Sequence, residues 1–143
     1  MLRPIILDAT PLGKIANPKR GIEISFWYQN ILNSGKEIII SEIADFEVRR
    51  ELVLRGLTKS INSLDTLANL HPYLALNTKT MRLAAQLWAD ARKKGSPTAD
   101  DKELDCDVIL AAQALISNSI IATENVGHLS RYTEAKHWKD IEP

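Results

Sequence analysis

Apolar residues in this chain follow two patterns: short continuous runs, and longer stretches with a spacing of three to four residues. The short runs are typical of buried strands, and the longer stretches predict amphipathic helices. Strands are expected at residues 4–8, 37–41, 73–76, 119–122 and near 136–138, and helices at 22–33, 44–55, 59–70, 78–94, 104–116 and 126–132. Because strands and helices alternate, residues 1–143 are expected to form one α/β domain with a mainly parallel sheet.

Breaks in these patterns predict two loops. Pro11, Gly13, Asn17 and Pro18 follow the first strand and favour a turn or loop there. The polar stretch 98–103 predicts a second loop, which leads into the helix at 104.

The predicted helix at 104–116 combines an apolar body with an acidic start. Its apolar residues recur at helical spacing and predict a mostly buried helix: Val108, Ile109, Ala112, Leu115 and Ile116. Asp105 and Asp107 lie in its first turn, where acids commonly cap free N–H groups and meet the positive end of the helix dipole. Asp107 is expected to have a further role, because other polar residues of the chain can converge on it.

Polar residues follow three of the predicted strands. Asp8 ends the first, Glu47 lies one turn into the helix after the second, and Asn125 follows the strand at 119–122. The carboxyl ends of parallel strands lie along one edge of a sheet, where sites form, so these residues are expected to meet Asp107 there. Carboxylates gathered in this way repel one another unless a cation neutralises them. Mg²⁺ prefers such oxygen ligands.

Composition limits the classes of function that remain. The chain has 18 basic and 18 acidic residues, so it lacks the basic excess typical of proteins that bind nucleic acid by bulk charge. Cys106 is the only cysteine, which excludes an intramolecular disulfide and a cysteine-based zinc site. No apolar run approaches the roughly 20 residues that span a bilayer, and no signal peptide is recognisable. A soluble, cytoplasmic protein is therefore expected.

Four motifs, taken in order, resemble those of PIN-domain ribonucleases, and within them the VapC-type toxins of bacterial toxin–antitoxin pairs. The motifs are I-I-L-D-A-T with Asp8, S-E-I-A-D-F-E with Glu47, D-V-I-L-A-A with Asp107, and T-E-N with Thr123 and Asn125. The third is the most specific, and the match spans the whole chain. The resemblance implies a PIN-like (flavodoxin-like) three-layer fold, bound Mg²⁺ or Mn²⁺, RNA cleavage, a homodimer and a small protein antitoxin.

The chain departs from the family pattern at two motifs. The segment around Glu47 is unusually charged, so neighbouring acids are rivals for its role: Glu42, Asp45 and Glu51. Asn125 stands where many family members have Asp. Asn offers an oxygen ligand without charge, so a second metal ion is expected to bind weakly or not at all, unless Asp105 or Glu124 substitutes.

The working hypothesis is that the protein is the toxin of a type II toxin–antitoxin system and hydrolyses RNA in a metal-dependent reaction. The predicted catalytic residues are Asp8, Glu47, Asp107 and Asn125, and the predicted metal ligands are Asp8, Glu47, Asp107 and Asp105. The predicted substrate-binding residues are Thr10, Thr123, Arg49 and Arg50, with Lys14 and Arg20 as further candidates for RNA backbone contacts. A metal ion can lower the pKa of water enough to supply hydroxide near neutral pH, so no side-chain nucleophile is required.

Three alternatives compete with this hypothesis. A haloacid-dehalogenase-like phosphatase needs a second Asp two residues after the first, and Thr10 stands there. A nucleotide-binding module needs a glycine-rich loop after the first strand, and residues 9–16 contain only Gly13. The third alternative is a PIN-like domain that binds RNA or a partner protein without cutting, which the neutral charge and Asn125 favour.

Overall fold

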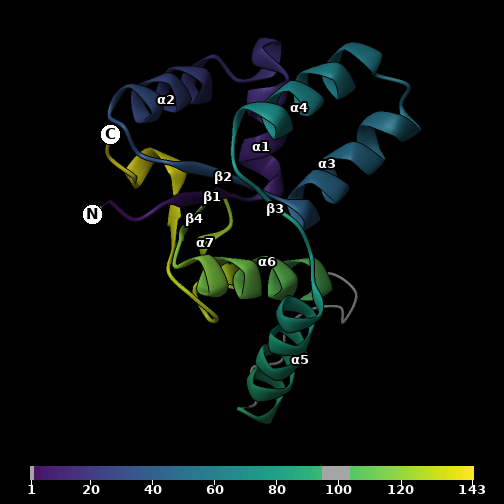
Figure 1. Ribbon diagram of the computed structural model, residues 1–143, viewed down its shortest axis with the longest axis vertical. Coiled ribbons are helices and arrows are strands. Elements are labelled where there is room, and N and C mark those ends of the chain that lie inside the picture. The colour runs from purple at the N-terminus through teal and green to yellow at the C-terminus, as the bar shows by residue number, and fades with distance from the viewer. Residues whose placement is uncertain (1, 95–103) are drawn as a thin grey trace.

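The computed structural model describes residues 2–94 and 104–143, in which strands and helices alternate (Figure 1). The strands are β1 (Ile5–Leu7), β2 (Ile38–Ser41), β3 (Tyr73–Leu74), β4 (Ile120–Thr123) and β5 (Ala135–His137). The α-helices are α1 (Ala9–Ala16), α2 (Ile22–Asn33), α3 (Glu42–Leu54), α4 (Thr58–Leu70), α5 (Thr78–Lys93), α6 (Leu104–Ser117) and α7 (Val126–Leu129). Two short 3-10 turns are η1 (Pro18–Arg20) and η2 (Trp138–Asp140).

The strands form one parallel sheet in the order β3-β2-β1-β4-β5. β1 is central, because Ile5 pairs with Ile38 of β2 on one side and with Ile120 of β4 on the other. Figure 1 shows α1 to α4 on one side of the sheet and α6 on the other, with α5 packed against α6. The predicted PIN-like α/β fold with a parallel sheet is therefore confirmed. The carboxyl ends of β1, β2 and β4 lie at one edge.

The central strands are covered on both faces, which explains their continuous apolar sequences. Successive side chains of a strand point to opposite faces. Ile5 and Leu7 belong to the core beneath α1, α2 and α4, together with Leu64. Ile6 belongs to the second core beneath α6, together with Leu110. The sheet is thus packed on both faces, and its carboxyl edge, where the candidate residues lie, is supported by both cores.

The segment after β1 is helical, so the prediction of a turn or loop there is wrong. α1 begins directly after Asp8, which caps it. Pro11 lies in the first turn, where backbone N–H groups have no acceptor within the helix, so its missing N–H removes no hydrogen bond. Leu12 and Ile15 are buried against the sheet. This tertiary burial stabilises a short helix that the local breaking signals oppose.

α6 confirms the predicted helix but buries a different set of residues. Val108 and Ala112 are buried as expected, whereas Leu115 is 43% exposed. Leu110 and Ala111 are fully buried, because α6 packs against the sheet on one side and α5 on another. The predicted loop at 98–103 lies outside the described residues.

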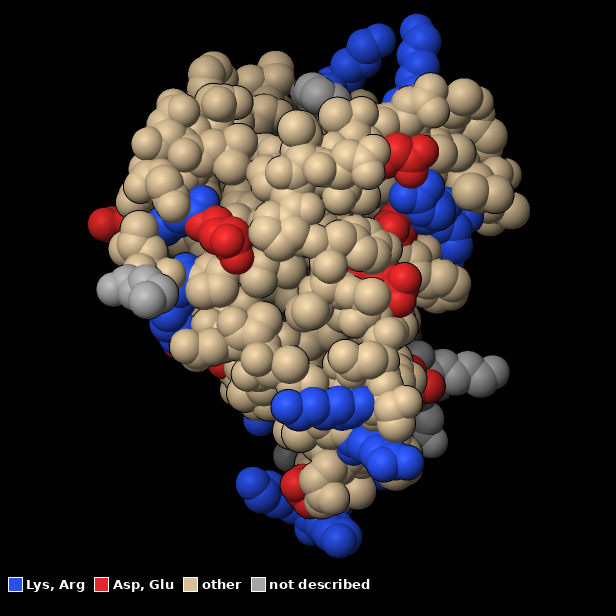
Figure 2. Space-filling model, viewed as in Figure 1, with Lys and Arg blue, Asp and Glu red and all other residues tan. Residues whose placement is uncertain are grey.

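Acidic and basic side chains are interspersed on the molecular face shown in Figure 2. Basic side chains gather over α5, at the lower end of that view. In the two described segments, no helix has the length and apolar character that a membrane span requires.

Candidate active site

Asp8 lies at the junction of β1 and α1, where its carboxylate is held from two sides. One oxygen accepts a hydrogen bond from the backbone N–H of Ala9 at 2.8 Å, and the other accepts one from the Thr123 hydroxyl at 2.7 Å. The side chain is buried, and this burial raises the pKa of Asp8. The two hydrogen bonds oppose the increase, whereas the charge of Glu124 adds to it. Asp8 is thus a fixed carboxylate that is costly to ionise.

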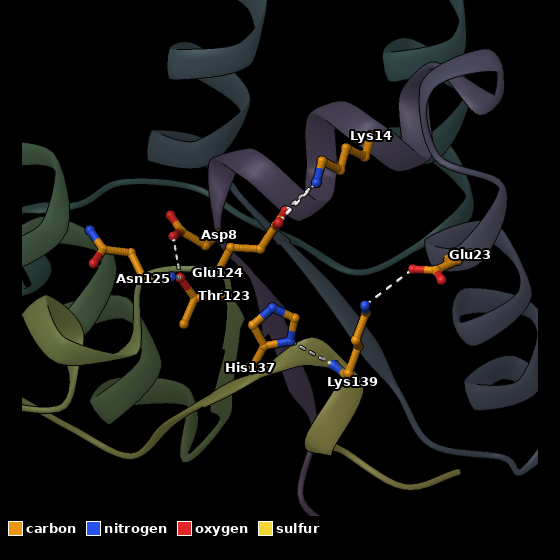
Figure 3. Close-up of polar contacts among 8 residues, drawn as sticks. All are labelled: Asp8, Lys14, Glu23, Thr123, Glu124, Asn125, His137 and Lys139. Atoms are coloured by element: carbon orange, nitrogen blue, oxygen red, sulfur yellow. Dashed lines mark hydrogen bonds and ion pairs between the residues drawn. The ribbon is translucent and has the colours of Figure 1, made fainter.

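Thr123 connects the end of β4 to Asp8. Its side chain is fully buried, donates to Asp8 and accepts a hydrogen bond from the backbone N–H of Asn125 at 2.8 Å. Figure 3 shows the three residues side by side. The hydroxyl of Thr123 therefore positions Asp8 and the turn at Asn125 together. The Asn125 side chain is exposed at the same edge of the sheet.

Glu47 and Asp107 bring two further carboxylates to Asp8 from helices on opposite sides of the sheet. Glu47 lies on α3, and Asp107 lies in the first turn of α6. The pKa of Glu47 is raised to about 7, chiefly by burial and then by the negative charges of Asp8 and Asp107. Arg50 and a hydrogen bond with Cys106 partly offset this increase. The predicted convergence of Asp8, Glu47 and Asp107 is therefore present in the fold.

The acids near Glu47 in sequence have other contacts. Glu42 accepts a hydrogen bond from the backbone N–H of Leu76 at 2.8 Å. Asp45 is buried and accepts one from the Tyr73 hydroxyl at 2.6 Å. Among the rivals considered from the sequence, Glu47 is the acid whose pKa is raised by both Asp8 and Asp107, so the structure favours Glu47 as the α3 member of the cluster.

The two arginines that were predicted to bind substrate differ in their surroundings. Arg49 forms an ion pair with Asp45 at 3.0 Å within α3 and another with Asp65 at 2.8 Å, which connects α3 to α4. Arg50 is exposed, and its guanidinium lies 5.2 Å from the centre of the Phe46 ring. Arg50 is therefore the better placed of the two for contact with a ligand.

Thr10 and Arg50 line a groove of about 560 Å³ between α1 and α3, and Glu47 also contributes to its wall. Asp105 lines a different pocket, between α5 and α6, and is not among the charges that raise the pKa of Glu47. A ligand in the groove would therefore reach Glu47 without contacting the pocket that Asp105 lines.

The donor atoms of the acidic cluster suit a hard divalent cation. Asp8, Glu47 and Asp107 offer carboxylate oxygens, which Mg²⁺ and Mn²⁺ accept. A cation would also relieve the mutual repulsion that raises the pKa of Glu47. Within residues 2–94 and 104–143, no three acidic, histidine or cysteine side chains are already arranged to hold a metal ion. Side-chain rotation would therefore have to complete a ligand set.

Cys106 and the ion pair between Lys14 and Glu124 are further neighbours of the site. Cys106 hydrogen-bonds Glu47, and burial is the main cause that raises the pKa of its thiol to about 11. Cys106 is therefore a neutral thiol near pH 7. Lys14 of α1 forms an ion pair with Glu124 at 2.8 Å (Figure 3). This contact was not predicted from the sequence, because a loop was expected where α1 lies.

Glu47→Gln is expected to stabilise the metal-free protein at pH 8. The pKa of Glu47 is about 7 when folded and 4.5 ordinarily, so between these values the folded state binds a proton more tightly than the unfolded state. The free energy of unfolding therefore falls as pH rises through this window. After allowance for the exposed part of the side chain, the gain for Gln is on the order of 1 kcal/mol at pH 8 and vanishes near pH 4.5.

Urea denaturation in EDTA at both pH values measures this difference. Glu51→Gln, an exposed change on the same helix, is the matched control and is expected to leave the pH dependence unchanged. An identical pH dependence in wild type and the Glu47 variant would show that Glu47 titrates normally.

Comparison with known proteins supports the fold. No protein-family model matches the sequence, and no curated protein sequence matches it significantly. Among solved structures, VapBC2 from Rickettsia felis bound to a promoter DNA fragment matches with a TM-score of 0.75 and 16% identity, covering 94% of this chain and 98% of that chain. FitAcB from Neisseria gonorrhoeae matches with a TM-score of 0.75 and 19% identity, covering 96% of this chain and 99% of that chain.

VapBC-1 from nontypeable Haemophilus influenzae gives a TM-score of 0.70 and 17% identity, covering 95% of this chain and 98% of that chain. Sequence identities this low establish similarity of fold alone. At that level they confirm the resemblance to VapC-type proteins inferred from the four motifs. The chain has the PIN-like fold.

Proposed function

We propose that this protein is a metal-dependent ribonuclease that acts as the toxin of a toxin–antitoxin pair. The observation that carries the proposal is the electrostatic coupling of Glu47 to both Asp8 and Asp107. These three carboxylates come from three separate elements and meet at the carboxyl edge of the sheet. Buried carboxylates that raise one another's pKa are a liability to a folded protein unless they serve a ligand.

The proposed roles follow from the positions of the side chains. Asp8, Glu47 and Asp107 would hold Mg²⁺ or Mn²⁺, and Asn125 would add a neutral oxygen at the same edge. A divalent cation supplies Lewis acidity, which offsets negative charge on the reacting phosphate and activates water. Arg50, beside Glu47 in the groove, would contact a phosphate of the substrate.

Thr123→Val is expected to lower the cleavage rate by about 10–100-fold, the usual cost of losing a group that orients a metal ligand. Valine keeps the shape of threonine but removes the hydroxyl that holds Asp8 and the backbone N–H of Asn125. Thr123→Ser retains that hydroxyl and is expected to keep most of the activity. Initial cleavage rates of the three proteins, compared at equal folded concentration, test this role. Equal loss in the Ser and Val variants would assign Thr123 to packing.

The partner proposed for this chain is a small protein antitoxin. The similar structures are VapBC and FitAB complexes, several of them bound to DNA. Copurification with the product of an adjacent gene for a short DNA-binding protein would support this pairing. A homodimer is also proposed, and light scattering of the purified protein measures it.

A PIN-like domain that binds RNA without cutting is the second candidate. Two points favour it: the neutral residue Asn125 stands where the family resemblance implies an Asp, and the described side chains form no ready set of three metal ligands. Metal binding alone does not separate the candidates, because an inactive site can still bind an ion.

Turnover separates the two candidates. The purified protein is incubated with a structured RNA pool in Mg²⁺, in Mn²⁺ and in EDTA. Cleavage that requires metal supports the nuclease, and the mapped cut sites begin to define its substrate. RNA binding without cleavage under all three conditions would favour the non-cutting domain.

A further inference from the structure

The edge strand β3 and the two residues that follow it contact helices on both sides of the sheet. We call this segment, residues 73–76, the brace. Figure 1 shows it running from the start of α3 toward α6. These two helices carry two acids of the candidate site, Glu47 on α3 and Asp107 on α6. The brace therefore joins both helices without being part of the acidic cluster.

Two hydrogen bonds attach the brace to the first turn of α3. The Tyr73 hydroxyl donates to Asp45 at 2.6 Å, and the backbone N–H of Leu76 donates to Glu42 at 2.8 Å. Asp45 is 7% exposed, and a buried carboxylate is costly without such partners. Glu47 lies two residues after Asp45, which is about 3 Å along the helix axis. The brace thus fixes α3 close to Glu47.

A third hydrogen bond attaches the brace to α6. The side-chain amide of Gln113 donates to the carbonyl oxygen of Leu74 at 2.7 Å. Gln113 is fully buried, and its own oxygen, Oε1, has no hydrogen-bond partner in the described part of the chain. An unpaired buried acceptor is destabilising, so an apolar residue would suit this position better for stability alone. The glutamine thus carries a penalty while it links α6 to the brace.

Apolar packing and strand pairing complete the link. Leu74 and Leu76 pack against the core that contains Ile43 of α3 and Leu110 of α6. Leu74 also pairs with Ser41 of β2, which continues the parallel sheet. Because the brace is joined to the sheet, to α3 and to α6, neither helix can shift along the sheet without breaking one of these contacts.

We propose that Tyr73 and Gln113 are positioning residues, which act through α3 and α6. They set the separation of Glu47 and Asp107, and thereby the affinity of the site for a divalent cation. This inference rests on the proposed metal-dependent function. A metal site needs its ligands within about 0.5 Å of the binding geometry. A looser brace would therefore raise the cost of bringing both carboxylates onto one ion.

The test is a double variant, Tyr73→Phe with Gln113→Leu, which removes the hydroxyl and the amide but keeps side chains of similar size. Calorimetric titration of the purified protein gives the dissociation constant for Mn²⁺. It is expected to rise by about tenfold, the lower end of the range for loss of groups that orient metal ligands. The rate of RNA cleavage should fall at low Mn²⁺ and recover at saturating Mn²⁺, because the ligands themselves remain.

Gln113→Leu alone separates positioning from folding. The change removes the hydrogen bond to Leu74, but it also removes the unpaired Oε1, so the two effects on stability oppose each other. The urea midpoint is therefore expected to stay close to that of wild type, whereas the dissociation constant for Mn²⁺ should rise by roughly threefold, half of the double effect on a logarithmic scale.

Trp27→Phe is the matched control. Trp27 is buried, and its indole N–H donates to the carbonyl oxygen of Ile141 at 2.9 Å. The variant loses a buried hydrogen bond, as the brace variants do, but in α2, which carries none of the three acids. It should lower the urea midpoint and leave the affinity for Mn²⁺ unchanged.

Three results would overturn the inference and leave the metal site in place. One is an unchanged affinity for Mn²⁺ in the double variant. Another is equal weakening by Trp27→Phe, which would show that affinity follows overall stability. The third is cleavage that does not recover at saturating Mn²⁺. Absence of Mn²⁺ binding by the wild-type protein would instead refute the metal-dependent function, and this inference with it.

Discussion

Replacing Asp107 with Asn is expected to abolish metal-dependent RNA cleavage while the protein stays folded. The change removes one of the two charges that raise the pKa of Glu47, and with it a proposed ligand. Loss of groups that merely orient a metal ligand costs 10–100-fold. Loss of a ligand itself should therefore lower the cleavage rate by at least about 100-fold. Asp8→Asn is expected to have an effect of the same size.

Asp140→Asn is the matched control, because Asp140 is an exposed acid in η2. It should cleave RNA at the wild-type rate. Calorimetric titration with Mn²⁺ gives a readout that does not depend on activity, and the Asp107 variant should bind the ion more weakly than the control. Full activity in the Asp107 variant would remove the proposed site. Lost activity together with a lowered melting temperature would instead indicate a structural role.

Leu110→Ala is expected to lower the free energy of unfolding by about 2–5 kcal/mol, the range for truncation of a buried leucine. Leu110 is 1% exposed and packs α6 against Ile6 and Ile121 of the sheet. Truncation removes apolar contacts and leaves a cavity that a parallel sheet cannot readily close. Chemical denaturation monitored by circular dichroism measures the change.

Leu115→Ala on the same helix provides the matched comparison. Leu115 is 43% exposed, so its truncation should cost less than about 1 kcal/mol. Equal losses in the two variants would contradict the orientation of α6 in the structure. Because Asp107 lies in the first turn of this helix, the Leu110 variant should also lose activity at temperatures where α6 loosens.

The two leucines show how far periodicity alone can go. Regular spacing of apolar residues predicts that 104–116 is a helix, because the helical repeat is a local property of the chain. The same spacing does not reveal which faces meet the sheet and α5, since those neighbours come from distant segments. The sequence therefore identified the helix correctly but included Leu115 among its buried residues.

The α1 segment shows the opposite outcome. Pro11 and Gly13 are local signals for a loop, and the prediction followed them. Burial of Leu12 and Ile15 against the sheet stabilises a helix instead. Because of that error the position of Lys14 was not predicted, and its ion pair with Glu124 follows only from the structure of α1.

The sequence alone determined the alternation of strands and helices and the candidate acids at the strand ends, because strand runs and motif spacings are local. It left Glu42, Asp45 and Glu51 as rivals of Glu47. Only the tertiary structure favoured Glu47 among them, since burial and the charges of Asp8 and Asp107 depend on elements far apart in the chain. The fold likewise decided that Lys19 and Trp138, which are far apart in the sequence, line the same cleft.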